Sequence, residues 1–291
     1  MTALDLVNLT RLMQRTSGRA DIRVGLIDGP VATTHPDIAS ENIHEIGGPL
    51  DGTCMQAKSA ACMHGTLVAG ILFGKRDSAA PAICPGCTLL IRPIFPEAPS
   101  PTDRMPTATA EELAEAITQS VEAGAHVLNM SLSVTGESSG GDVRLNQALS
   151  YAASRGTICV AAAGNQGMLG GSTIVRHPWV IPVAACGIDG GPVALSNLGR
   201  SIGIWGLLAP GHNIVSLDPT GKTFPFGGTS AATAFVTGTV ALLWSEFPEA
   251  SASIIKLGLT RATTPRRRAL VPPLLNAWTA YTAIARYVGS L

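Results

Sequence analysis

The chain has 291 residues, of which 46% are hydrophobic and 14% are charged, and its 20 basic residues balance its 20 acidic ones. This composition predicts a large apolar core that needs no disulfide framework, and the neutral balance excludes a general attraction to nucleic acid or to a membrane surface. No apolar run reaches the roughly 18 residues of a membrane-spanning helix.

The N-terminal segment predicts a short leading helix, because residues 3–17 carry apolar side chains at helical spacing. The first residues lack the basic start and the long apolar centre of a secretory signal peptide. The core begins almost at once, which leaves no room for a folding prodomain. We therefore expect the protein in the cytoplasm.

Apolar runs and helical patterns alternate along the rest of the chain. Buried strands are predicted at residues 23–27, 88–95, 127–133, 157–163 and 180–185. Helices are predicted from the Thr109–Glu112 capping box to Gly124, from an Asp142 cap to Gly156, and at 249–262 and 273–288. The alternation predicts an α/β fold with a mainly parallel sheet, one face of which the last two helices cover. We expect one domain over residues 1–291, with a leading helix in 1–20 and the core in 21–288.

Asp28 follows the strand predicted at residues 23–27 and precedes Gly29 and Pro30. Catalytic and binding groups of parallel α/β proteins gather at this carboxyl edge of the sheet. The plainer interpretation is that Asp28 only begins a turn.

His64 stands at the predicted mouth of a helix rich in small residues, next to Gly65. A lone histidine is more often structural, but the glycine leaves space beside the imidazole. Ser230 follows a glycine pair at a second loop-to-helix junction, where its hydroxyl either projects from the first turn or merely caps the helix. Asn165 follows Gly164 and could be a simple turn residue.

Aspartate, histidine and serine together are the groups that nucleophilic catalysis requires. A serine hydroxyl is a weak nucleophile until a neighbouring base takes its proton. Histidine has a pKa near neutrality and can play that part, and an aspartate can hold the imidazole in the right tautomer.

The six cysteines do not form the pattern of a disulfide framework. Cys84 and Cys87 make a CxxC pair, with Cys54 and Cys62 upstream. Free thiols, one oxidised pair and a four-cysteine zinc site all stay open. The basic run at residues 266–268 reads as a solvated loop or a local docking patch.

Four motifs in one order resemble the subtilase family of serine proteases. They are an apolar strand ending in Asp28-Gly29, then His64-Gly65-Thr66-Leu67-Val68-Ala69-Gly70, Ala162-Ala163-Gly164-Asn165, and Gly228-Thr229-Ser230-Ala231-Ala232. The order of aspartate, histidine and serine is the one known for subtilisin. The resemblance covers about residues 21–288 and implies a three-layer subtilisin-like fold, with a mainly parallel central sheet flanked by helices.

The resemblance also implies the roles of the matching residues. Asp28, His64 and Ser230 would form the catalytic triad, and the side chain of Asn165 would donate to the oxyanion. Substrate would bind along Ser131, Leu132 and Ser133 on one side and along Ala162, Ala163 and Gly164 on the other.

A narrower resemblance is to the cyanobactin-maturation proteases, which trim ribosomally made precursor peptides. It rests on Leu26-Ile27-Asp28-Gly29-Pro30-Val31, on Leu90-Ile91-Arg92-Pro93-Ile94-Phe95, on Ala123-Gly124-Ala125-His126-Val127-Leu128-Asn129 and on Leu208-Ala209-Pro210-Gly211. In most subtilases Ser or Thr separates the aspartate from the glycine, whereas here, as in that subgroup, the two are contiguous. Ala231 and Leu67 are further departures, and neither position belongs to the triad.

We therefore expect a serine endopeptidase that removes the leader from a precursor peptide and that binds neither nucleic acid nor membrane. A general intracellular subtilase and a silent peptide-binding module are the alternatives, and the oligomeric state stays open. No cofactor is expected. Many subtilases bind calcium after the histidine helix, but residues 73–81 supply one carboxylate and two cations, so we expect no metal there.

Overall fold

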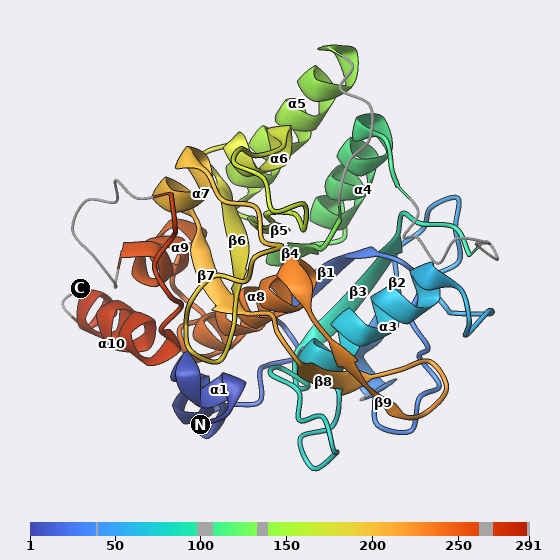
Figure 1. Ribbon diagram of the computed structural model, residues 1–291, viewed down its shortest axis with the longest axis horizontal. Helices are drawn as coiled ribbons and strands as arrows, with labels where there is room; N and C mark the ends of the chain where they lie inside the picture. The colour runs from blue at the N-terminus through green and yellow to red at the C-terminus, as the bar shows by residue number, and fades with distance from the viewer. Residues whose placement is uncertain (39, 98–106, 133–138, 262–269, 290–291) are drawn as a thin grey trace.

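The computed structural model describes residues 1–38, 40–97, 107–132, 139–261 and 270–289. Within these ranges seven parallel strands form one sheet in the order β2-β3-β1-β4-β5-β6-β7. Their bounds are β1 Arg23–Asp28, β2 Ile43–Glu45, β3 Thr88–Pro93, β4 Val127–Met130, β5 Ile158–Ala162, β6 Val180–Cys186 and β7 Leu207–Pro210. An antiparallel hairpin, β8 Ile214–Leu217 with β9 Thr223–Phe226, lies beside the sheet (Figure 1).

Helices cover both faces of the sheet, which confirms the predicted three-layer α/β fold (Figure 1). One layer contains α4 Ala110–Glu122, α5 Ser139–Arg155, α6 Thr173–Arg176 and α7 Arg200–Trp205. The other contains α3 Ala60–Phe73, α8 Gly228–Glu246, α9 Ala252–Arg261 and α10 Ala277–Val288, together with α1 Ala3–Leu6 and α2 Leu9–Met13. The last two helices thus lie on one side of the sheet, beside α8, as predicted.

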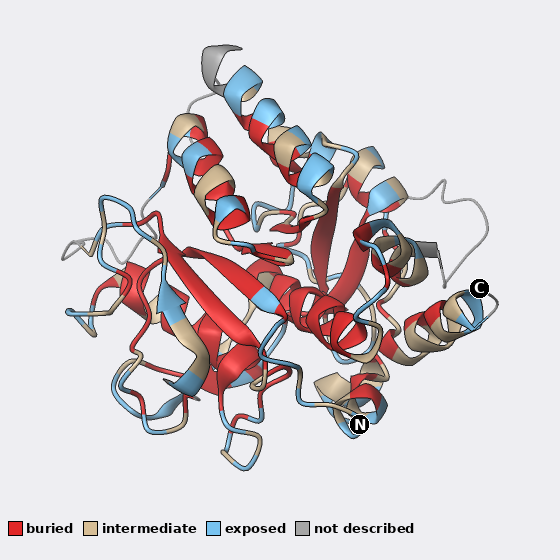
Figure 2. Cartoon of the chain, turned by 180° about the vertical axis from the view of Figure 1, so that it is seen from behind, coloured by how far each residue is buried: buried red, intermediate tan, exposed pale blue. Residues whose placement is uncertain are grey.

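Alternating side chains of the central strands divide the core in two. In β3, Leu89 and Ile91 face the α8 side and Leu90 faces the α4 side. Because both faces of the central strands are covered, these strands are mostly apolar, and polar residues such as Arg92 and Asn129 are exceptions. Figure 2 shows the strands and α8 as the most deeply buried part of the chain.

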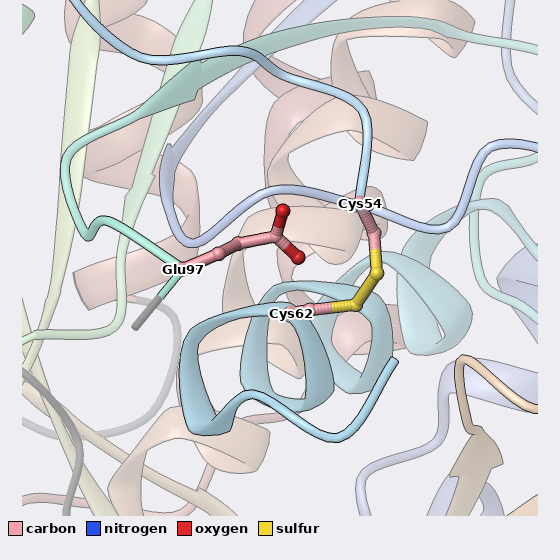
Figure 3. Close-up of side chains that lie close together, drawn as sticks. All are labelled: Cys54, Cys62 and Glu97. Atoms are coloured by element: carbon pink, nitrogen blue, oxygen red, sulfur yellow. A yellow bond between two sulfur atoms is a disulfide. The ribbon is translucent and has the colours of Figure 1, made fainter. Parts of the chain in front are cut away.

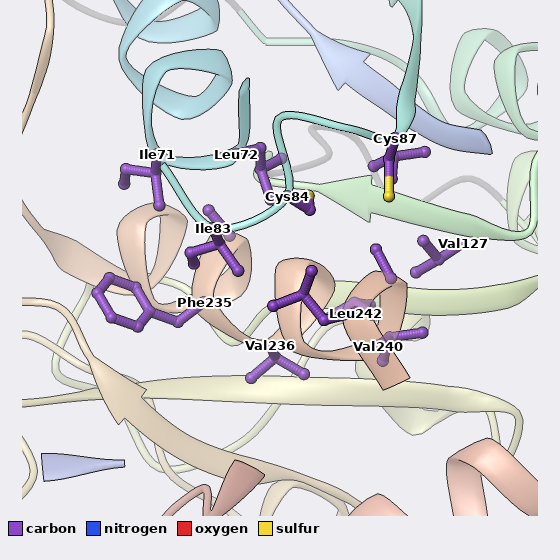
Figure 4. Packing of buried hydrophobic residues seen from close by; sticks show 14 of the residues in the cluster. Ile71, Leu72, Ile83, Cys84, Cys87, Val127, Phe235, Val236, Val240 and Leu242 are labelled. Atoms are coloured by element: carbon purple, nitrogen blue, oxygen red, sulfur yellow. The ribbon is translucent and has the colours of Figure 1, made fainter. Parts of the chain in front are cut away.

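Helix α8 is the centre of its layer and is buried from Thr229 to Ser245. It has no amphipathic stripe, because it packs against strands below and against α3 on its flank. Ile71 and Leu72 of α3 and Ile83 after it contact the same cluster as Phe235 and Val236 of α8 (Figure 4). The two helices therefore share one core.

Several predicted boundaries are corrected. The leading helix is two short helices, broken at Asn8, whose φ of 52° is left-handed. Helix α5 begins at Ser139, so Asp142 lies in its first turn and is not its cap. The capping box of Thr109 with Glu112 is present as predicted. The basic run at residues 266–268 lies outside the described residues. Among the described helices, none is long and apolar enough to cross a membrane.

Candidate active site

Asp28 is the last residue of β1, which lies between β3 and β4 near the middle of the sheet. Its side chain is fully buried. Oδ1 accepts a hydrogen bond from the backbone N–H of Gly29 at 2.7 Å, and Oδ2 is buried without a donor among the described residues. The strand therefore fixes a carboxylate at the carboxyl edge of the sheet, where the sequence predicted it.

His64 lies inside α3 and not at its mouth, which corrects the sequence prediction. Ser59 caps the helix by accepting from the N–H of Cys62 at 3.1 Å, so the first turn precedes the histidine. A Cβ added at Gly65 would lie 2.6 Å from the carbonyl oxygen of Pro30 and nearer still to that of Gly29. A Cβ at Gly29 would in turn overlap the backbone of Ala61. These two glycines let α3 lie directly on the turn that follows Asp28.

The imidazole of His64 contacts both of its predicted partners. Nδ1 donates to Oδ1 of Asp28 at 2.6 Å, and Nε2 lies 3.0 Å from Oγ of Ser230. The histidine side chain is 13% exposed and that of Asp28 is fully buried, so the contact is largely shielded from water. With Nδ1 protonated toward the carboxylate, Nε2 is free to accept the hydroxyl proton of Ser230.

Ser230 stands in the first turn of α8, where backbone N–H groups have no partner within the helix. The helix begins at Gly228, whose φ of 78° is left-handed. A Cβ at Gly228 would lie 2.9 Å from Oδ1 and 3.0 Å from Nδ2 of Asn165. Glycine is therefore required both for the turn and for the approach of Asn165.

The orientation of Asn165 is fixed by Thr229. Oδ1 of Asn165 accepts from the backbone N–H of Thr229 at 2.9 Å and from its hydroxyl at 3.1 Å. The amide nitrogen Nδ2 is thereby left as a donor, and Asn165 lines the same pocket as Ser230. A side-chain N–H and the backbone N–H of Ser230 can together stabilise a negative oxygen.

A pocket of about 300 Å³ opens in front of Ser230. Its walls include Ser131 and Leu132 after β4 on one side and Ala162 and Gly164 after β5 on the other. Ala163, the remaining residue predicted for this wall, is buried and does not line the pocket. Ser133 lies outside the described residues. Small side chains on the second wall leave room for a substrate side chain.

Ser131 also belongs to a buried chain of hydrogen bonds. Its hydroxyl donates to the backbone carbonyl of Ser230 at 3.3 Å and accepts from Nδ2 of Asn129 at 2.9 Å. The carboxamide oxygen of Asn129 accepts from the hydroxyl of Thr237 on α8 at 3.0 Å. The chain ties the end of β4 to the helix that carries Ser230.

The sequence did not reveal two residues of the site. Phe226, at the end of β9, places its ring edge-on to the imidazole of His64, with 5.5 Å between the centroids and 82° between the planes. Thr229 holds Asn165, as described above. Phe226 stands four residues before Ser230, and an aromatic so near a candidate nucleophile is the only signal that could have indicated it.

The structure resolves the open question of the cysteines. Cys54 and Cys62 form a disulfide bond, whereas Cys84, Cys87, Cys159 and Cys186 are free and buried. Burial raises the pKa of Cys84, while a hydrogen bond from that thiol lowers the pKa of Cys87. Since Cys54 and Cys62 are bonded to each other, the four-cysteine zinc site is absent from this state.

Similarity to known proteins extends over most of the chain. The subtilase family model (Peptidase S8) matches residues 19–276. Subtilisin DY of Bacillus licheniformis is 27% identical over 266 residues, which span 90% of each chain. A mutant of the protease domain of PatA is 33% identical with a TM-score of 0.82, covering 93% of this chain and 97% of that one. Prenylagaramide maturation protease PagA is 30% identical with a TM-score of 0.81, covering 95% and 98%.

Proposed function

Because the chain belongs to the subtilase family of serine proteases, we propose that Ser230, His64 and Asp28 are its catalytic triad. The observation that carries this proposal is the position of the His64 imidazole, 2.6 Å from Asp28 and 3.0 Å from Ser230. Single substitutions of Ser230, His64 or Asp28 by alanine should each remove most activity and leave the fold intact, because the three act as a unit. Near-normal turnover by Ser230→Ala would refute the assignment of the nucleophile.

The triad would work by proton transfer through His64. As Oγ of Ser230 attacks the carbonyl carbon of the scissile bond, its proton passes to Nε2, and the carboxylate of Asp28 stabilises the imidazolium. Nδ2 of Asn165 and the backbone N–H of Ser230 would donate to the oxyanion that forms. Nε2 then protonates the leaving amine, and water releases the acyl group by the same steps in reverse.

The substrate would be an extended peptide. Ser131 and Leu132 follow a strand end and line the pocket, so a substrate backbone can pair with this edge as an added strand. We assign Ser133 and the pocket-lining Ala162 and Gly164 to the same binding region, as the family resemblance implies, and we leave out Ala163, which does not line the pocket. No role is assigned to a nucleic acid, a membrane or a cofactor.

We propose further that the peptide is a ribosomally made precursor and that the enzyme removes its leader during natural-product maturation. The support is the 30% identity to a maturation protease over 95% of this chain. A protease that acts in the cytoplasm, where we place this one, must discriminate its substrate from other proteins. A disordered leader can satisfy this need, since backbone pairing gives affinity and a few pockets fix the cut.

The test compares two substrates. The protein is incubated with a synthetic precursor peptide that carries a leader and a core and, separately, with unfolded casein, and the products are identified by mass spectrometry. We expect one cut between leader and core and little digestion of casein, with Ser230→Ala as the inactive control. Casein fragmentation at rates that match the precursor would overturn the maturation role and favour a general intracellular subtilase.

The alternative that is not an enzyme is a subtilase-like module that binds peptides but has no catalytic activity. A fluorophosphonate probe, which labels an activated serine, separates the two. Labelling of the wild type but not of Ser230→Ala or His64→Ala supports the enzyme. Absence of labelling in the wild type would favour the binding module.

A further inference from the structure

Cys54, Cys62 and Glu97 form a cluster of potential metal ligands beside the catalytic helix (Figure 3). Their sulfur and carboxylate oxygen atoms all lie within 4.8 Å of one another. Cys62 belongs to the first turn of α3, two residues before His64. Cys54 lies in the loop ahead of α3, and Glu97 reaches the pair from the segment after β3. Among the described residues, this is the only such group of three His, Cys, Asp or Glu side chains.

Glu97 is already held in place by the loop between the two cysteines. Its Oε1 and Oε2 accept from the backbone N–H groups of Gln56 and Met55, each at 2.9 Å. Hydrogen bonds of this kind orient the carboxylates that bind metals and leave further lone pairs available. The carboxylate therefore faces the two sulfur atoms in a fixed position.

The disulfide closes this site only while the cysteines are oxidised. Disulfides are rare in the cytoplasm, where glutathione keeps thiols reduced, and that is where we place this enzyme. Two thiols of a reductant convert the disulfide into two cysteine thiols and are themselves joined as a disulfide. Each cysteine can then lose its proton to a solvent base and bind a cation as thiolate.

Two thiolates and one carboxylate are a donor set that suits zinc. With Zn–S bonds of about 2.3 Å and Zn–O bonds of about 2.0–2.2 Å, tetrahedral ligand atoms stand roughly 3.5–4 Å apart. The ligand atoms already lie within 4.8 Å of one another. The two sulfur atoms are bonded to each other here and must move apart after reduction, which side-chain rotation allows because the two Cα atoms are 5.4 Å apart. Soft thiolates also select zinc over calcium and magnesium.

We propose that the reduced protein binds one zinc ion through Sγ of Cys54, Sγ of Cys62 and the carboxylate of Glu97, with the fourth position open to water. The ion takes the place of the disulfide as the link between the loop and α3. The helix that carries His64 is then tethered in both redox states. The proposal does not depend on the protease activity, and its test does not measure that activity.

The experiment uses the full chain, reduced with a phosphine that is converted to its oxide, and freed of metal. Cobalt(II), a spectroscopic substitute for zinc, is added first, and zinc is then titrated against a chromophoric chelator. We expect cobalt–thiolate charge-transfer bands, one zinc per chain, and neither signal in the oxidised protein. Failure of the reduced protein to bind either ion, or equal binding by the oxidised protein, would overturn the proposal.

Matched variants locate the site. Cys62→Ser should abolish binding and Glu97→Gln should weaken it by at least about tenfold, whereas Cys84→Ala, in the second cysteine pair, should bind as the wild type does. Zinc should also raise the melting temperature of the reduced wild type and of Cys84→Ala, but not that of Cys62→Ser. Circular dichroism verifies that each variant is folded. Binding that survives Cys62→Ser and is lost in Cys84→Ala would place the metal at the other pair.

Discussion

Replacing Gly65 by alanine should separate the histidine from the aspartate. The added Cβ would lie 2.6 Å from the carbonyl oxygen of Pro30, a distance that real Cβ atoms do not reach. The obstructing atoms are backbone, so they cannot move aside as a flexible side chain would. Helix α3 must therefore shift away from the turn after Asp28, and His64 moves with it.

Two opposing effects determine how much Gly65→Ala changes the stability of the protein. Alanine favours a helix over glycine by about 1 kcal/mol, whereas overpacking a core contact costs typically about 1–3 kcal/mol. We expect a net loss of about 1 kcal/mol, which lowers the melting temperature by roughly 2–4 °C. The nearest obstructing atom, the carbonyl oxygen of Gly29, would lie 2.4 Å from the added Cβ, so the helix must retreat by at least about 0.6 Å. This lengthens the contact between His64 and Asp28, and displacements approaching 1 Å cost up to about 100-fold in rate. We expect kcat/KM to fall about 10- to 100-fold.

The assay measures the rate of fluorophosphonate labelling, kcat/KM on the precursor peptide and the melting temperature. Gly47→Ala is the matched control, because no atom lies within 4 Å of a Cβ at that position. It should leave all three quantities unchanged. If Gly65→Ala instead labels at the wild-type rate and melts at a higher temperature, helix propensity dominates and the close approach of α3 does not position His64.

Three further predictions concern the oxyanion, calcium and pH. Asn165→Ala should lower kcat by about 100- to 1000-fold with little change in KM; a large rise in KM at constant kcat would make Asn165 a substrate-binding residue. A calcium chelator should leave the melting temperature of the oxidised protein unchanged. The guanidinium of Arg76, in the loop after α3, donates to the carbonyls of Thr16, Ala82 and Ile83, so a side-chain cation already occupies that loop. A drop of about 10 °C or more would contradict this. Burial lowers the pKa of Lys256 to about 8, so the unfolded chain binds more protons above that pH and stability due to this residue rises as the pH increases from about 8 to 10. The free energy of unfolding of the wild type and of Lys256→Met is measured in urea at pH 8 and at pH 10. Relative to the variant, the wild type should become about 1–2 kcal/mol more stable at the higher pH, after allowance for the partial exposure of Lys256. An equal difference at the two pH values would refute the lowered pKa of Lys256.

Much of the fold could be predicted because its strongest signals are local. A strand covered on both faces must be apolar throughout, and a capping box marks a helix start, so β1 and α4 were found. The break at Asn8 was missed, because apolar spacing continues across it and a left-handed φ leaves no trace in that pattern. The hairpin of β8 and β9 was also missed, since its strands have four residues each and little periodicity.

Sequence motifs predicted the main residues of the site. They did not predict the position of these residues within their helices or their contacts with other segments. Asp28, His64 and Ser230 were named from their glycine-rich surroundings, and the structure brings them together. The prediction that His64 lies at the mouth of α3 was wrong, because the cap at Ser59 lies five residues ahead of it. The contacts of Phe226 with His64 and of Thr229 with Asn165 join segments far apart in sequence, so only the tertiary fold could reveal them.

The hydrogen bond between His64 and Ser230 spans 166 residues. A ribosome adds about 5–20 residues per second, so the serine is made roughly ten to thirty seconds after the histidine. During that interval Asp28 and His64 have been synthesised but Ser230 has not. Helix α8, around which one layer of the core packs, is also missing. Such distant pairings also form slowly. With Ser230 as the proposed nucleophile, the growing polypeptide cannot cleave a peptide bond until synthesis has passed the helix that completes its core.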